Sequence, residues 1–407
     1  MTLAVSVLAA ALATCACPAA AQDWAAPITA VQKSLADAGV SIGGGVTGFG
    51  QGMAFGDGLY GVPFGGKADF LLGLDGGRLG LWNGFTVSAH LEQEFGQNET
   101  ERADGPIIPL NTALAFPLLG GTTTDLALTV TQAFGSNFSV SLGKFNMLDA
   151  AAKTPIMGGG GETTFWNTGF AAPISGVTPP YIIGGLFALK TAPATFSLLI
   201  YDPRNAQALG VIEHPFADGV TFSLSATVPL AIGGLPGFHT LRAAYSTQQG
   251  FDLEDVPQLL LPPGSARDLR SMQGYYFGSY MIDQYFWRDT DNPARGWGPF
   301  AQVALSDANP NPIAGSGFVG LGGSTPFTGR LDDRWGVGWF KYVFSPALKA
   351  SATVVGASLN DESGVEAYYD AKIADHIRFG PDAQLIWPGT PGKSTALFLG
   401  LRGRLVF

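Results

Sequence analysis

The chain ends in Ala396-Leu397-Phe398-Leu399-Gly400-Leu401-Arg402-Gly403-Arg404-Leu405-Val406-Phe407, and this stretch decides the fold. In an extended strand, successive side chains point to opposite faces. Leu399 and Leu401 therefore share one face with the terminal aromatic residue, while Arg402 and Arg404 share the other. This pattern is typical of a strand in an outer-membrane β-barrel, which turns its apolar face to lipid and its polar face to the interior.

The same alternation recurs after residue 40. At roughly 10 residues per strand plus turns, the length accommodates about 16 strands, with about 14 or 18 as alternatives. We therefore expect an all-β fold, a transmembrane antiparallel up-and-down β-barrel over residues 41–407. The clearest alternating segments are 85–94, 126–131, 138–142, 220–227, 240–246, 348–354 and 365–373.

A soluble β-sandwich would show the same alternation, with its apolar face inward. Two features favour the barrel. Charged residues make up 13% of the chain, about half of the share in an ordinary soluble domain. Aromatic residues, among them Trp82, Phe134, Trp339 and Trp387, lie near segment ends, as they do at membrane interfaces.

The N-terminus resembles an export signal. An apolar run from Leu3 to Leu12 is followed by Ala19-Ala20-Ala21, the small-residue pattern of a cleavage site. We expect residues 1–21 to be a cleaved signal peptide, although its usual positive n-region is missing; a lipoprotein signal through Cys15 or Cys17 is the alternative. Export of a barrel indicates the bacterial outer membrane.

Residues 22–40 form a separate short segment. Ile28, Val31 and Leu35 recur at helical spacing, and Gly39 follows them. This pattern predicts a short helix in an N-terminal segment on the periplasmic side, too short to be a domain.

Composition excludes several classes of function. A net charge of −10 argues against nucleic acid, because phosphates require a basic surface. The constriction of a barrel can nevertheless carry the sign opposite to the total charge. The four histidines have no metal-binding spacing, and Gly158 to Gly161 lacks the Lys and Ser or Thr of a phosphate loop. We expect no enzyme activity, no cofactor and no bound metal.

The alternation lapses between Asp149 and Pro180, a stretch that is long for a connection in a compact fold. We expect this stretch to fold into the barrel as a constriction loop. Its Glu162, Trp166 and Asn167 offer a carboxylate, a flat apolar face and an amide, which are the groups that bind a sugar. These three residues are the first candidates for contact with a solute.

Polar-face residues on the strands are further candidates. Opposed acidic and basic rims would orient water and sugar hydroxyls while a neutral solute passes. Arg295, Arg330, Asp332 and Asp333, in contrast, lie in turn-like segments and are expected to brace the turns. The inward candidates are His90, Glu92, Glu94, Arg242, Lys349, Glu366, Tyr368, Lys372, Arg402 and Arg404.

Seven short motifs occur in the order in which carbohydrate-selective porins of Gram-negative outer membranes carry them, and the chain resembles that family. They are residues 67–75 (KADFLLGLD), 78–84 (RLGLWNG), 142–149 (LGKFNMLD), 295–300 (RGWGPF), 309–312 (NPNP), 329–336 (GRLDDRWG) and 366–369 (EAYY).

The resemblance implies a monomeric or loosely associated barrel through which monosaccharides and small oligosaccharides diffuse passively. The expected partners are sugars, outer-membrane lipid and the barrel assembly machinery, which would recognise the C-terminal strand ending in Phe407. The alternatives are a general non-selective porin and a secreted, soluble, β-rich glycan-binding protein.

Overall fold

The computed structural model describes residues 25–115, 124–262, 264–327 and 329–407. The expected signal peptide, residues 1–21, lies outside the described residues. Among the helices of the described residues, none is both long enough and apolar enough to cross a membrane.

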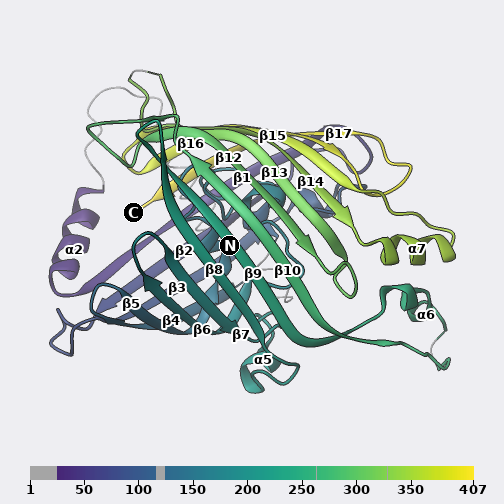
Figure 1. Cartoon of the computed structure of the whole chain (residues 1–407). Helices are drawn as coiled ribbons and strands as arrows, with labels where there is room; N and C mark the ends of the chain where they lie inside the picture. Colours follow the sequence, from purple (N-terminus) through teal and green to yellow (C-terminus); the bar gives the residue numbers. More distant parts are fainter. Residues whose placement is uncertain (1–24, 116–123, 263, 328) are drawn as a thin grey trace.

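The strands form one antiparallel sheet that closes on itself (Figure 1). Each strand pairs with its neighbours in the sequence, and β1 pairs with β17, from Gly45 opposite Val406 to Phe55 opposite Leu397. The two-residue β11 pairs with β12 alone, whereas β10 also pairs with β12 along its length, which leaves 16 strands around the barrel. The expected fold class and strand number are therefore confirmed.

The strands are β1 (Val40–Phe55), β2 (Phe64–Asp75), β3 (Phe85–Gly96), β4 (Thr124–Phe134), β5 (Phe138–Asn146), β6 (Tyr181–Lys190), β7 (Thr195–Tyr201), β8 (Thr221–Ile232), β9 (Leu235–Phe251), β10 (Ser271–Gln284), β11 (Trp287–Arg288), β12 (Gly296–Ser306), β13 (Ile313–Ser324), β14 (Arg334–Phe344), β15 (Glu362–Ala374), β16 (Ile377–Trp387) and β17 (Ala396–Val406). The helices are α2 (Ala26–Asp37), α3 (Met147–Ala151), α4 (Thr168–Ala171), α5 (Leu209–Glu213), α6 (Val256–Leu259) and α7 (Pro346–Val354), with single 3₁₀ turns η2 (Glu99–Glu101), η3 (Thr112–Leu114) and η5 (Leu253–Asp255).

The two faces of the wall differ as the alternation predicts. On β17, Leu399 and Leu401 are 49% and 52% exposed on the outer face, while Phe398 and Arg402 are almost fully buried on the inner face. Apolar side chains stay exposed on the outside of a barrel when lipid tails replace water as their surroundings. A soluble sandwich would bury them, so this alternative is excluded.

The expected N-terminal helix is present as α2, which packs against the start of β1 at one end of the barrel. Figure 1 shows α2 at this end and α6 and α7 at the opposite end. Gly39, with a φ of 93°, makes the turn from the helix into β1, a backbone conformation that favours glycine. The guanidinium of Arg78 donates a hydrogen bond of 2.8 Å to the carbonyl of Ala36 and ties the helix to the β2–β3 turn.

One segment with an alternating pattern is not a strand. Residues 348–354 form most of α7 instead of the strand that the sequence predicts, and Lys349 pairs there with Asp361. The helix begins because the Ser345 hydroxyl accepts a hydrogen bond from the N–H of Leu348 and Pro346 occupies the first turn. Ala350 and Ala352, at alternate positions, are compatible with a strand or a helix, so the cap at Ser345 determines that the segment is helical.

Candidate functional site

The segment between β5 and β6, residues 147–180, lies inside the barrel as expected for a constriction loop. Seven of its large apolar side chains are buried, although the segment carries only the short helices α3 and α4. A loop buries such side chains only against another surface, here the inner wall. They are Leu148, Ile156, Met157, Phe165, Trp166, Phe170 and Val177.

Two carboxylates on the wall hold this loop by its backbone. Asp283 on β10 accepts hydrogen bonds of 3.2 Å from the N–H groups of Ile156 and Met157. Glu366 on β15 accepts hydrogen bonds from the N–H groups of Trp166, at 2.5 Å, and Asn167, at 3.1 Å. Hydrogen bonds to charged groups contribute about 1.5–3 kcal/mol each. The loop is therefore fixed at two places on the wall.

Arg402 on β17 supplies a third attachment. Its guanidinium donates a hydrogen bond of 2.8 Å to the carbonyl of Thr164 and lies 5.5 Å from the centre of the Trp166 ring. Phe49 on β1 packs edge-on against the same indole at 5.0 Å. The side chain of Trp166 is fully buried among these groups. Its indole is thus part of the support of the loop and shows no face to the lumen.

A second loop, residues 97–115 of the β3–β4 connection, stacks on the first. The carboxylate of Glu362 on β15 accepts hydrogen bonds from the N–H groups of Ile107, at 2.7 Å, and Ile108, at 2.8 Å. The N–H of Thr112 donates a hydrogen bond of 2.8 Å to the carbonyl of Trp166. The two loops therefore form one unit anchored to β15.

The unit fills one side of the barrel with an apolar core. Phe165 packs edge-on against Tyr368 at 4.8 Å and stacks with Phe170 at 4.4 Å. Wall residues from β12 to β17 and β1 complete the core, so water is excluded from this sector. The wall contributes Met53, Phe300, Ile313, Phe318, Phe340, Tyr342, Phe344, Tyr368, Ile386, Ala396 and Phe398.

The opposite sector, along β2 to β9, remains open. A cavity of about 820 Å³ lies between this part of the wall and α3. Cross-strand hydroxyl pairs on its wall include Thr131 with Ser141, at 2.7 Å, and Ser197 with Ser225, at 2.6 Å. Each hydroxyl both donates and accepts, as a sugar hydroxyl does. The lining hydroxyls come from Ser41, Ser88, Thr129, Thr131, Ser141, Ser197, Ser223 and Ser225.

A charged cluster around Lys67 separates the two sectors. The ammonium of this β2 residue lies 2.6 Å from Glu162 in the loop and 3.3 Å from Asp69, and it also pairs with Glu92. The side chains of Lys67 and Glu92 are almost fully buried. The loop therefore meets the β2–β3 wall through paired charges, whereas it meets the other sector through apolar contacts together with the hydrogen bonds of Asp283, Glu366 and Arg402.

His90 joins wall and loop at the edge of the cavity. Its Nε2 lies 2.9 Å from an oxygen of Asp69, and its Nδ1 lies 2.9 Å from an oxygen of Asp149 in α3. The Asn146 side chain donates a hydrogen bond of 2.9 Å to Glu92 beside it. The start of the loop is thus clasped to the wall next to the open lumen.

The profile of the carbohydrate-selective porin, OprB family, matches residues 73–407. The chain belongs to this family. It is a carbohydrate-selective outer-membrane porin, as the resemblance implies, and not an enzyme. No curated protein matches the chain at a significant level.

Two solved structures are similar to this porin over most of its length. The high-pH structure of Pseudomonas putida OprB shares 19% identity, with a TM-score of 0.80 over 93% of this chain and 97% of that chain. The low-pH structure of the same protein has 14% identity and a TM-score of 0.52 over 94% of this chain and 98% of that chain. At these identities the likeness supports the barrel fold alone.

The porin distributes its candidate residues over three environments. Trp166, Asn167, Glu366, Tyr368 and Arg402 are buried in or beside the apolar core. Direct stacking of a sugar on Trp166, the sequence-based expectation, does not fit this arrangement, because the wall already covers the ring. Glu162 and Glu92 pair with Lys67, and His90 lies 3.8 Å from Glu92. Glu94 is buried further along β3, and Arg242 faces the open cavity.

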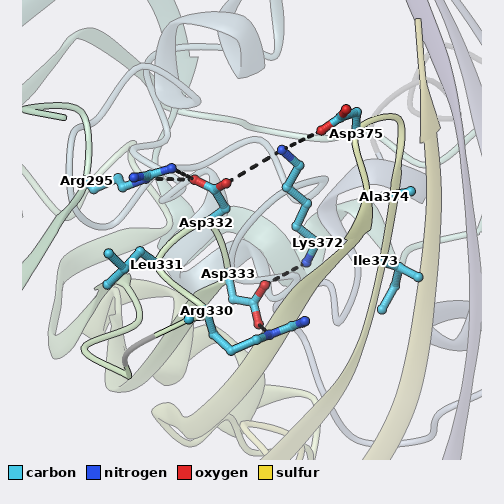
Figure 2. A pocket seen from close by; sticks show the side chains of 10 residues that line it. Arg295, Arg330, Leu331, Asp332, Asp333, Lys372, Ile373, Ala374 and Asp375 are labelled. Atoms are coloured by element: carbon cyan, nitrogen blue, oxygen red, sulfur yellow. Dashed lines mark hydrogen bonds and ion pairs between the residues drawn. The ribbon is translucent and has the colours of Figure 1, made fainter. Parts of the chain in front are cut away.

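Lys372 lies elsewhere. It lines a surface pocket of about 430 Å³ at the α2 end of the barrel, formed by the β13–β14 and β15–β16 turns (Figure 2). Its ammonium pairs with Asp375 at 2.9 Å and with Asp332 at 3.6 Å. The residue therefore stands at the rim, near the end of β15, and its contact with a solute stays a prediction.

The turn residues beside Lys372 brace the rim, as expected. Arg295 and Asp332 pair at 2.5 Å, and Arg330 and Asp333 pair at 2.6 Å, so the guanidinium groups in Figure 2 are satisfied by carboxylates of the same rim. Clustered ion pairs of this kind fix turns more than they bind solutes.

Three residues that alternation did not single out complete the site. Lys67 organises the charged cluster, and Asp149 and Lys153 line the cavity from the loop. Lys67 and Asp69 are two positions apart and so share a face, a signal that was present in the sequence. Asp149 and Lys153 lie where no periodicity exists, and their position depends on how the loop folds.

Asp69, His90 and Glu92 offer ligand atoms that all lie within 4.8 Å of one another, a group whose types and spacing suit a metal ion. The ammonium of Lys67 already lies against Asp69 and Glu92. A cation would have to displace this paired charge, so the cluster is better suited to holding the loop than to binding metal.

Proposed function

We propose that sugars cross the outer membrane through the off-centre cavity along β2 to β9. One observation carries this proposal: eight serine and threonine hydroxyls line a cavity of about 820 Å³ beside a loop that is fixed to the wall. Such a surface replaces part of the hydration of a sugar as it passes, because water and sugar hydroxyls make the same hydrogen bonds.

The candidate residues would form two groups, one that borders the lumen and one that positions the loop. His90, Glu162, Glu92 and Glu94 shape the charged border of the lumen, and Arg242 contacts solutes. The buried set of Trp166, Asn167, Glu366, Tyr368 and Arg402 acts indirectly, because these residues set the position of the loop and hence the width of the passage. We expect monosaccharides and small oligosaccharides to diffuse passively, with weak binding that permits release.

Assembly would follow the usual route for such barrels. We infer that residues 1–21 are removed on export and that residues 22–40 lie on the periplasmic side. The C-terminal strand, whose last residue is Phe407, would be recognised by the barrel assembly machinery. Truncation of Phe407 should lower the amount of folded porin in the outer membrane, measured as the heat-modifiable form on gels. Equal amounts would reject this contact.

The permeation proposal is tested by removing a hydroxyl pair. The double variant Ser197→Ala and Ser225→Ala removes both partners of one hydrogen bond, so neither is left unsatisfied. We expect slower glucose and maltose entry in liposome swelling with unchanged KCl conductance. The matched control is Ser136→Ala, an exposed serine in the β4–β5 turn. Equal sugar rates in the double variant would favour a general, non-selective pore.

A further inference from the structure

Arg242 carries a positive charge at the lumen. Among the described residues, no carboxylate forms an ion pair with it. Its guanidinium donates hydrogen bonds to the hydroxyls of Ser223, at 2.8 Å, and Thr178, at 2.6 Å, and lies 5.4 Å from the centre of the Phe277 ring. These neutral partners fix the orientation of the group without cancelling its charge. The remaining N–H donors are available to an anion.

Lys153 adds a second such cation. It is exposed, it follows α3 on the inward loop, and it lines the same cavity as Arg242. Within the part of the chain that the structure describes, its ammonium makes neither an ion pair nor a hydrogen bond. One cation thus comes from the wall and the other from the loop, on the two surfaces that bound the passage.

Three other inward cations have acidic partners, and Arg334 donates a hydrogen bond of 3.1 Å to the carbonyl of Ile156 in the loop. Lys144 pairs with Asp125, Arg402 with Asp370 at 3.3 Å, and Arg404 with Glu162 at 3.8 Å. The charged groups that line the cavity besides Arg242 and Lys153 are His90 and Asp149, which pair with each other. The passage is therefore locally positive, although the whole chain carries a net charge of −10.

We propose that this lumen favours carbohydrates that carry a carboxylate, aldonates and uronates, over neutral sugars of the same size. This inference rests on the proposed permeation path and narrows its substrate class. A guanidinium binds a carboxylate through two parallel N–H···O bonds, while the hydroxyl wall binds the rest of the solute. A positive, narrow passage also concentrates anions at its entrance.

The test is a bi-ionic measurement in planar bilayers with potassium gluconate. The reversal potential gives the permeability of gluconate relative to potassium. For Arg242→Gln with Lys153→Gln we expect this ratio to fall by roughly threefold to tenfold, because both local cations are lost. The control is Lys341→Gln, which removes one positive charge, as Lys153→Gln does, from an exposed residue on the outer face of β14 and should leave the ratio unchanged.

Lys153→Gln alone provides the second variant, because its side chain has no hydrogen-bond or ion-pair partner in the described residues and its loss cannot disturb the fold through one. It should produce part of the same decrease. A gluconate ratio that is equal in wild type and both variants overturns the proposal. Glucose entry into liposomes is measured in parallel: unchanged glucose rates with a lower gluconate ratio support the proposal, whereas wild-type porin that passes no sugar at all would reject the permeation path itself.

Discussion

Gly400 of β17 faces the indole ring of Trp166 so closely that a Cβ at this glycine would lie 2.6 Å from Cζ3 of the ring. Real Cβ atoms do not approach other atoms to this distance, so the loop reaches its position on the wall only because residue 400 has no side chain. The contact joins the end of the chain to the centre of the inward loop.

Gly400→Val should therefore displace the loop. Overpacking of a filled core costs about 1–3 kcal/mol. We expect a lower midpoint of urea unfolding and altered single-channel conductance. Gly403→Ala on the same strand is the control, because the nearest atom to its Cβ would be 3.7 Å away, an ordinary contact. If both variants behave alike, close packing at Gly400 is not what holds the loop.

Trp166→Ala should widen the passage and not abolish sugar binding. The buried indole supports the loop against Phe49 and Arg402, and loss of a buried Trp costs about 3–5 kcal/mol. In liposome swelling, the entry rate of trisaccharides should increase more than that of glucose. Trp82→Ala, at an exposed position, serves for comparison. If glucose entry is lost while the relative rates of small and large sugars stay the same, Trp166 contacts the sugar directly.

Glu366→Gln and Glu362→Gln should release different loops. Glu366 holds residues 166 and 167, whereas Glu362 holds residues 107 and 108. An amide has one acceptor oxygen where the carboxylate has two, so each variant leaves a buried N–H poorly paired, at a cost of about 1–3 kcal/mol. Limited proteolysis should cut near residue 160 in the first variant and near residue 107 in the second. The same cleavage sites in both would contradict two separate anchors.

Glu99 predicts a pH dependence of stability. It lies in η2, in the β3–β4 connection, and burial raises its pKa to about 7 from 4.5 although Arg102 lies 3.6 Å away and opposes the shift. Between these values the folded protein holds more protons than the unfolded chain, so the free energy of unfolding falls as pH rises through this window. The contribution is fully present below pH 4.5 and absent above about pH 7.

Glu99→Gln removes this titration. We expect the urea midpoint of wild type to decrease, relative to the variant, as pH rises from 4.5 to about 7. Glu254→Gln, at an exposed loop position, should retain the wild-type dependence. Parallel curves for wild type and Glu99→Gln would show that this carboxyl does not titrate in the window.

The sequence predicts the wall well because alternation is a local property. Leu401 and Arg402 show on which side each residue of β17 lies, and the outward and inward assignments agree with burial. It also predicts that the stretch after Asp149 folds inward, since four glycines and no periodicity leave no strand there. The strand predicted at 348–354 is a helix because of its N-terminal cap. The alternation pattern does not take this short capping signal into account.

What could not be predicted is which inward residues meet the loop and which meet solvent. The sequence predicts both Trp166 and Arg242 as lumen residues, yet Trp166 is buried and Arg242 lines the cavity. The difference depends on contacts across long separations in the sequence, such as that of Glu366 with Trp166, which lie 200 positions apart. Such contacts are set by the packing of the whole barrel, which no local pattern encodes.

The apolar core on one side of the barrel separates the residues that determine stability from those that determine what passes. Substitutions among the hydroxyls of β3 to β8 change a surface that carries little of the packing energy, so this side can accept new solutes at small cost. The aromatic side has no such freedom, since each ring there supports another. We therefore expect related porins to vary in the open sector and to keep the filled one.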